Sequence, residues 1–146
     1  MKIVLGALIF LSTLCGPSIY ADSSENTPLL GVWIPKEKDS HVEVFKDGDK
    51  YYGKVIWMQE KDNGKLDTNN PDDKLKTQPI LNMVFLKDFK EDEPGKEWSD
   101  GTVYDPHNGK TYSAKIYYKN NDTLELRGYV GIPLFGRTET WTRYKP

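Results

Sequence analysis

Few side chains in this sequence have the types and spacing that chemistry at one site requires. Histidine occurs only at His41 and His107, and the single cysteine is Cys15, close to the N-terminus. A zinc site needs three or four nitrogen, sulfur or oxygen ligands held together, so we predict no metal centre of this kind. Four oxygen donors share one loop: Asp67, Asn69, Asn70 and Asp72. They lack the glycine and closing glutamate of an EF-hand, and such residues also stabilise turns, which is the interpretation we prefer to Ca²⁺ binding.

Catalytic motifs are also missing from the chain. No Gly-x-Ser-x-Gly sequence marks a nucleophile. Ser40 and His41 are adjacent, and adjacent side chains of a strand point to opposite faces. The paired carboxylates lie in charged stretches, where a solvated surface explains them. We therefore predict no catalytic residue and no cofactor, and an enzyme is the third hypothesis behind two others.

Aromatic residues give better support for binding, because they are spread over most of the sequence. They would either line an apolar cavity with a few polar groups or fill a solid core. Arg137, Glu139, Trp141 and Arg143 alternate along the chain, so a strand would place them on one face. Facing inward, the arginines could meet an anionic head group; facing outward, they would form an ordinary surface cluster. The predicted ligand-binding residues are Trp33, Tyr104, Tyr112, Arg137, Trp141 and Arg143.

Short strands must position these side chains, because hydrophobic residues recur with period two rather than 3.6. After the Gly31–Trp33 segment, the expected strands are residues 41–45, 51–59, 79–86, 97–98 with 101–104, 110–118, 123–130 and 136–144. Asn108-Gly109 predicts a tight hairpin turn. Two stretches are expected to be loops: residues 60–78, with one helical turn near 73–76, and the charged residues 88–95. About eight hairpin-linked strands predict an all-β, antiparallel up-and-down barrel, whose interior is filled or holds one small ligand.

Length, charge and the N-terminal segment limit the other possibilities. The chain has 146 residues and a formal net charge of −2, which allows one domain and offers no electrostatic footprint for nucleic acid. One cysteine excludes a disulfide framework. Residues 1–21 combine Lys2, a short apolar run and a small residue, Ala21, as in a secretory signal peptide. The run is shorter than the roughly 20 residues of a membrane span. We expect a lead-in at 22–28, a barrel at 29–146, and a periplasmic or secreted protein.

Two pairs of motifs carry a family resemblance. Gly31-x-Trp33 near the start and an arginine on the last strand resemble lipocalin and avidin barrels, where the arginine stacks on the tryptophan, gains ~0.5–2 kcal/mol and plugs one end. Asp67-x-x-Asn70-Pro71-Asp72 and Tyr104-Asp105-Pro106-x-Asn108-Gly109 follow in order. Together with the glycine and tryptophan positions of the last two strands, they resemble the bacterial exported family called domain of unknown function 2147. The resemblance implies a small barrel and leaves the activity open.

One departure from the family pattern lies at Leu81-Asn82-Met83, where the family tends to have Leu-Gly-Leu. Because Asn tolerates a left-handed backbone, we expect an unchanged fold. Two functional hypotheses follow from the sequence. The first is an exported, non-catalytic barrel that binds a small amphipathic or hydrophobic ligand. The alternative is a structural or interaction module of the cell envelope, with its contacts in the loops Glu60–Gln78 and Asp88–Gly95. The protein partner and the oligomeric state stay open.

Overall fold

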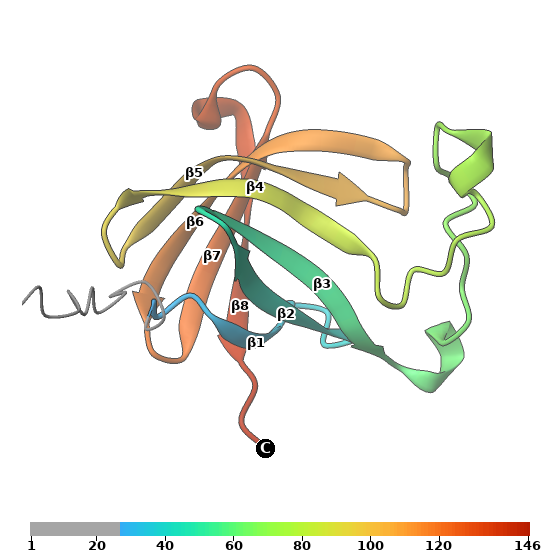
Figure 1. Cartoon of the computed structure of the whole chain (residues 1–146), viewed down its shortest axis with the longest axis horizontal. Coiled ribbons are helices and arrows are strands. Elements are labelled where there is room, and N and C mark those ends of the chain that lie inside the picture. Colours follow the sequence, from blue (N-terminus) through green and yellow to red (C-terminus); the bar gives the residue numbers. More distant parts are fainter. Residues whose placement is uncertain (1–26) are drawn as a thin grey trace, which may run out of the picture.

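Eight antiparallel strands form a closed barrel in the computed structural model, which describes residues 27–146 (Figure 1). The strands are β1 (Gly31–Ile34), β2 (Ser40–Asp47), β3 (Lys50–Met58), β4 (Val84–Glu93), β5 (Glu97–Asp105), β6 (Lys110–Asn120), β7 (Thr123–Tyr129) and β8 (Gly136–Arg143). Each strand pairs with the next, and β1 pairs with β8 to close the barrel. The predicted all-β up-and-down barrel is confirmed. The predicted signal peptide, residues 1–21, lies outside the described residues.

Alternating side chains explain how β6 and β7 form one wall of the barrel. Ala114 and Ile116 are buried on β6, and Leu126 on β7 lies opposite Ile116. The intervening Lys115 and Arg127 face each other on the outer surface. This period-two pattern buries one face of each strand and solvates the other. The sequence predicted both strands to within two residues for that reason.

The two connections beside β4 differ from the sequence prediction. Residues 79–83 were expected to begin a strand, but the strand begins at Val84, and Asn82 has a positive φ of 70°. The expected loop at 88–95 is mostly strand, because β4 continues to Glu93 and pairs with β5. A φ of 62° at Asp88 interrupts the alternation, so both Leu86 and Phe89 are buried. The outward charges concealed this strand from sequence reasoning.

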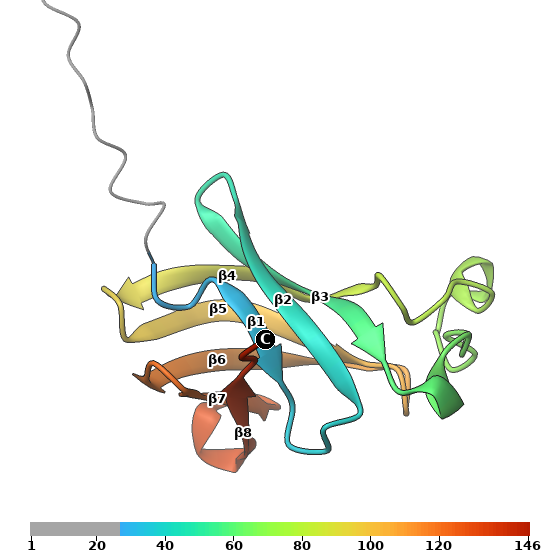
Figure 2. The same ribbon diagram turned by 90° about the horizontal axis from the view of Figure 1, so that it is seen from below.

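Long connections gather at one end of the barrel, and short turns at the other. The β3–β4 connection contains two short 3-10 helices, η2 (Glu60–Asp62) and η3 (Asp73–Leu75), and the β7–β8 connection contains η4 (Pro133–Phe135). The helical turn expected near 73–76 is therefore present. The segment before β1 lies at the opposite end, beside the β4–β5 turn (Figure 2). No helix within residues 27–146 is long and apolar enough to cross a bilayer.

Candidate functional site

Trp33 and Arg143 close one end of the barrel. Trp33 is fully buried, and its indole Nε1 donates a hydrogen bond to the Leu29 carbonyl at 2.9 Å. The Arg143 guanidinium lies 4.1 Å from the centre of the Trp33 ring and donates to the Leu30 carbonyl at 3.0 Å. The cation–π contact expected between the first and last strands is present. It joins β1 to β8, so these two predicted site residues are part of the closed end and do not line a cavity.

Gly31 is required for this closure. Its φ is +122°, and a Cβ at this position would lie 2.9 Å from Nη1 of Arg143. A larger residue would therefore strain the backbone and displace the guanidinium. Arg143 also donates hydrogen bonds to the carbonyls of Pro28 and Asn121, which ties the segment before β1 and the β6–β7 turn to the last strand. The Gly-x-Trp sequence and the C-terminal arginine thus form one structural unit.

A solid core fills the barrel next to this closure. The largest side chains of the core are Trp33, Tyr51, Phe89 and Trp98, all of them fully buried. The rings of Tyr51 and Trp98 meet edge to face, with centroids 5.9 Å apart. The indole Nε1 of Trp98 has no hydrogen-bond partner among residues 27–146. The filled-core alternative left open by the sequence is therefore true of this end.

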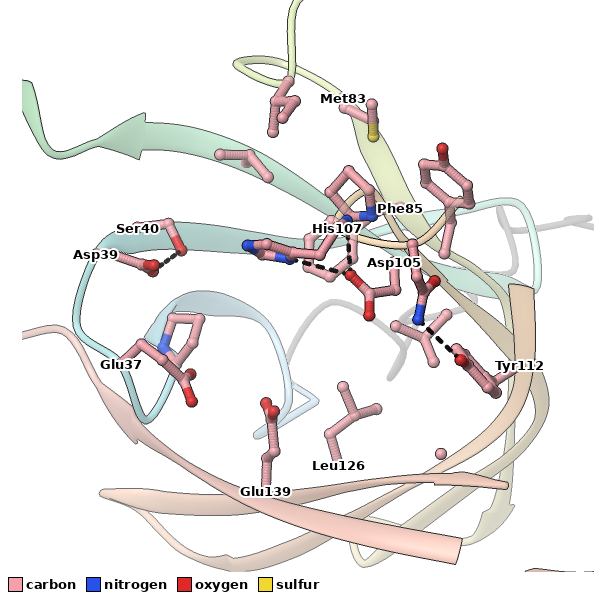
Figure 3. Close-up of a pocket in the computed structure, with 18 of the residues that line it drawn as sticks. Glu37, Asp39, Ser40, Met83, Phe85, Asp105, His107, Tyr112, Leu126 and Glu139 are labelled. Atoms are coloured by element: carbon pink, nitrogen blue, oxygen red, sulfur yellow. Dashed lines mark hydrogen bonds and ion pairs between the residues drawn. The ribbon is translucent and has the colours of Figure 1, made fainter. Parts of the chain in front are cut away.

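The opposite half of the barrel is hollow and contains a cavity of about 900 Å³ (Figure 3). Its deep wall is apolar and comes from five strands, with Val55, Phe85, Val103, Leu126 and Trp141. The rings of Phe85 and Trp141 lie 6.3 Å apart. Four of these five residues are aliphatic or phenyl side chains that the sequence analysis did not single out. Alternation along each expected strand, which places every second side chain inside the barrel, was the signal that could have found them.

The alternating face of β8 points inward, which settles its orientation. Arg137, Glu139 and Trp141 all line the cavity, and Glu139 projects into it beside Leu126 (Figure 3). The indole Nε1 of Trp141 donates to Oε2 of Glu139 at 3.2 Å. Along this face the chain passes from the closure at Arg143, through an apolar floor, to charged groups at the mouth. Such a gradient suits a molecule with one apolar and one polar end.

Two predicted tyrosines also line the cavity. The Tyr112 hydroxyl accepts a hydrogen bond from Nδ2 of Asn108 at 3.0 Å. The Tyr104 hydroxyl donates to Oδ1 of Asp67 at 2.7 Å. Burial of Tyr104, together with its hydrogen bond to the Asp67 carboxylate, raises the pKa of Tyr104 to about 12. The Tyr104 phenol is therefore a neutral hydroxyl group in the wall of the cavity at physiological pH.

Tyr104 belongs to a hydrogen-bonded latch between two connections at the open end. Buried Asp67 accepts from Tyr104 and, through Oδ2, from Nδ2 of Asn70 at 2.7 Å. Nδ2 of Asn69 donates to the carbonyls of Pro106 and His107, each at 3.0 Å. We call the side chains of Asp67, Asn69, Asn70 and Tyr104 the latch. It fastens the β3–β4 connection to the β5–β6 turn.

The latch explains the spacing of the two family motifs. The motif that begins at Asp67 and the motif that begins at Tyr104 are in contact, 37 residues apart in the chain. A Cβ on Gly109 would lie 1.9 Å from the carbonyl oxygen of Asn69, so only glycine allows this approach. The hydrogen bonds of the loop are those expected of turn residues, and Asp72 likewise accepts from the backbone N–H of Lys74. Among residues 27–146, no three His, Cys, Asp or Glu side chains are grouped to hold a metal ion.

Charges of both signs surround the mouth of the cavity. The acidic lining residues are Glu37, Asp39, Asp62, Asp105 and Glu139, and the cationic ones are Lys61, Lys65 and Arg137. A hydrogen bond from Lys65 lowers the pKa of Asp62. Arg137 is exposed and forms no ion pair with any other described residue. It is therefore a free cation beside an apolar cavity.

A closed eight-stranded barrel, plugged by a tryptophan–arginine contact and hollow at the other end, defines a lipocalin-like protein. A solved structure supports this class: the chain is similar to "Protein HP1028 from the human pathogen Helicobacter pylori", which "belongs to the lipocalin family". The TM-score is 0.74 at 28% identity, over 82% of this chain and 85% of that one. Residues 31–143 match the family model "Uncharacterized protein conserved in bacteria (DUF2147)", and the chain belongs to this family. No curated protein matches it.

Proposed function

We propose that this protein is exported and binds a small hydrophobic or amphipathic ligand in the open half of its barrel, without catalysis. The observation that carries the proposal is the cavity of about 900 Å³ behind an apolar wall. Protein interiors are packed so closely that voids larger than one water are few. Small-molecule sites occupy roughly 300–1,000 Å³ and are mostly apolar with a few polar groups. The cavity has this size and this chemistry.

The arrangement of polar groups gives the ligand an orientation. Trp141, Phe85 and Leu126 contact its apolar part, while Tyr112 and Arg137 are placed for its polar end at the mouth. A carboxylate on Arg137 would be favoured by charge, since this guanidinium has no carboxylate partner of its own. Glu139 works against an anion that sits deeper, beside Trp141. The polar group of the ligand is therefore expected at the rim and not at the floor.

Export rests on the signal-peptide pattern of residues 1–21. The pattern joins a basic residue, a short apolar run and a small residue before the expected cleavage point. Placement in the periplasm or outside the cell would also bring the barrel close to lipids. Sequencing the N-terminus of the chain isolated from its host is the direct check. A mature chain that begins near Asp22 supports export, and a chain that still begins at Met1 contradicts it.

The alternative, an interaction module, has one supporting observation. The β3–β4 connection extends beyond the barrel (Figure 1) and is held in place by the latch, so it presents a fixed surface. Of the two loops expected to carry contacts, only Glu60–Gln78 is a connection; most of Asp88–Gly95 is part of β4. This reduces the surface available for the alternative. Loss of a pulled-down partner on deletion of 73–76, with ligand binding unchanged, would favour it.

Ligand binding is tested by filling the cavity from one face of β5. Val103 lines the cavity, whereas Ser113 on the neighbouring strand β6 is exposed and does not line it. Native mass spectrometry of the chain from its host should show a bound mass, and a fluorescent fatty acid should bind at micromolar concentration. Val103→Phe should weaken that binding at least about tenfold, as lost contact area predicts.

Ser113→Phe is the matched control, since it adds a ring of the same size on the outer face of the barrel. It should leave the affinity for the fluorescent fatty acid unchanged. A ligand-free native mass combined with no binding of the probe by the wild type would contradict the proposal. Equal weakening by both substitutions would show that the probe does not occupy the cavity.

A further inference from the structure

The β7–β8 connection exposes an unusual number of large apolar side chains. Val130, Ile132, Leu134 and Phe135 are 72%, 51%, 75% and 75% exposed. They fall within six consecutive residues, and the connection with η4 projects away from the barrel (Figure 1). Single exposed apolar residues are ordinary, but contiguous ones mark contact with a partner or a membrane. We call residues 130–135 the apolar loop.

Arg127 holds the apolar loop in its projecting position. Its Nε donates to the Pro133 carbonyl at 2.7 Å, and Nη2 donates to the Leu134 carbonyl at 3.2 Å. A third hydrogen bond joins Nη1 to the Thr138 hydroxyl at 2.7 Å. These bonds satisfy backbone carbonyls of the loop on the barrel side, which leaves the side chains of Leu134 and its neighbours directed outward. The exposure is therefore built into the fold.

The charges around the apolar loop indicate what kind of surface would cover it. No charged residue lies between Arg127 and Arg137 in the sequence, so an uncharged segment is bordered by a cation on each side. Neither arginine forms an ion pair in the part of the chain that the structure describes. Apolar side chains flanked by cations fit an interface between acyl chains and anionic head groups.

The apolar loop is also continuous with the mouth of the cavity. Val130 and Phe135 line the cavity, together with Arg137 at the start of β8. Ile132 and Leu134 lie on the same connection and do not line it. A flat surface that covers the loop would therefore lie beside the mouth. Ile132 and Leu134 therefore belong only to the outer surface of the loop, whereas Val130 and Phe135 border both that surface and the cavity.

We propose that the apolar loop docks the barrel on a lipid surface that carries anionic head groups. Ile132, Leu134 and Phe135 enter the boundary between head groups and acyl chains, and Arg127 and Arg137 contact the lipid phosphates. The mouth of the cavity then lies beside the lipid surface. The docking surface can be tested separately from the ligand-binding proposal, because Ile132 and Leu134 lie outside the cavity.

Vesicle flotation tests this proposal on the chain as its host produces it. The vesicles contain phosphatidylcholine alone or phosphatidylcholine with phosphatidylglycerol. The wild type should float with the anionic vesicles, and several-fold less with the neutral ones or at high salt. Ile132→Ser with Leu134→Ser should lower partitioning at least roughly tenfold, since two apolar side chains lose their contact with lipid. Arg137→Gln should reduce only the binding to anionic vesicles.

The matched control is Leu66→Ser with Leu75→Ser. Both leucines are 43% exposed and lie in the β3–β4 connection, so they remove the same chemistry from another place and should leave flotation unchanged. All variants share residues 1–26, so those residues contribute equally to each measurement. The far-ultraviolet circular dichroism spectra should agree, because exposed substitutions rarely unfold a protein.

Two results would overturn the proposal. One is flotation of the Ile132→Ser, Leu134→Ser variant to the same extent as the wild type. The other is no wild-type flotation, together with a dimer in light scattering that this variant dissociates; a second copy of the chain would then cover the loop. Because Ile132 and Leu134 do not line the cavity, the variant should still bind the fluorescent fatty acid. Failure of docking and failure of ligand binding are therefore distinguishable.

Discussion

At one end of the barrel the inward side chains are Trp33, Tyr51, Phe89 and Trp98, and they pack into a solid core. At the other end Val55 and Val103 hold inward positions on the strands that carry Tyr51 and Trp98 at the solid end, and Phe85 and Trp141 complete the wall of a cavity of about 900 Å³. The strands and their hydrogen bonding are continuous from one end to the other. The difference lies in side-chain volume and in the connections, which are short at the solid end and long at the hollow end. The solid core and the proposed ligand site thus lie at opposite ends.

The largest expected effect comes from removing the tryptophan of the solid end. Trp33→Ala should lower the free energy of unfolding by ~3–5 kcal/mol, because a fully buried indole leaves a cavity that its neighbours cannot fill. Urea unfolding measures this loss. Trp57 is the matched control: it is exposed on β3 and stacks on His41 at 4.5 Å, so Trp57→Ala should cost ~1 kcal/mol or less. Equal losses would mean that Trp33 does not fill the solid end as described.

The second comparison sets two arginines of one strand face against each other. Arg143→Ala removes the contact with Trp33 and hydrogen bonds to three carbonyls, and it should cost ~2–4 kcal/mol. Arg137→Ala, at the hollow end, should cost ~0.5 kcal/mol or less, because this side chain is exposed and has no ion-pair partner among the described residues. Thermal or urea unfolding of both variants gives the two values.

Arg143→Lys sharpens this second comparison. Lysine keeps the charge but lacks the planar fork that stacks on an indole and donates in several directions. It should recover less than half of the lost stability. Full recovery would show that charge alone closes the barrel and that the stacked geometry contributes little.

The closure of the solid end could be predicted from the sequence, whereas the full extent of its core could not. The Gly31-x-Trp33 motif and the arginine of the last strand have a fixed relation in a closed meander, since the first and last strands must pair. Large aromatic residues at alternating positions then indicate the core. The extent of β4 was predicted wrongly, because its charges face outward and the bulge at Asp88 breaks the alternation that would have revealed Phe89 as buried.

The hollow end could be predicted only in part. Alternation places Arg137 and Trp141 on one face, but the direction of that face depends on pairing between strands that are distant in the sequence. Whether side chains reach across the barrel depends on its diameter, which no local pattern sets. The latch joins Asp67 to Tyr104 across 37 residues, and nothing in either motif alone shows that they touch. The pairing of strands that are distant in the sequence therefore decides which side chains line the cavity and which motifs touch.

The smallest expected effect concerns the latch at the hollow end. Tyr104→Phe removes the hydroxyl that donates to Asp67 and should cost ~1–2 kcal/mol at neutral pH, since the buried carboxylate loses one of its two hydrogen-bond donors. The loss of binding free energy for the fluorescent fatty acid should exceed the loss of unfolding free energy, because the latch holds a connection that lines the mouth. Urea unfolding and titration with the fluorescent fatty acid measure both.

The pH dependence of unfolding makes this prediction specific to Tyr104. Its pKa is raised from 10.0 to about 12 in the folded protein, so between these pH values the unfolded chain releases the proton first. The unfolded state then binds fewer protons than the folded state, and stability must fall as pH rises through this window. Stability from the neutral phenol is fully present below pH 10 and lost by about pH 12. The Tyr104→Phe variant should lose stability less steeply between pH 10 and about 12, because it has no phenol here to titrate. Parallel losses in both proteins would place the titrating group elsewhere.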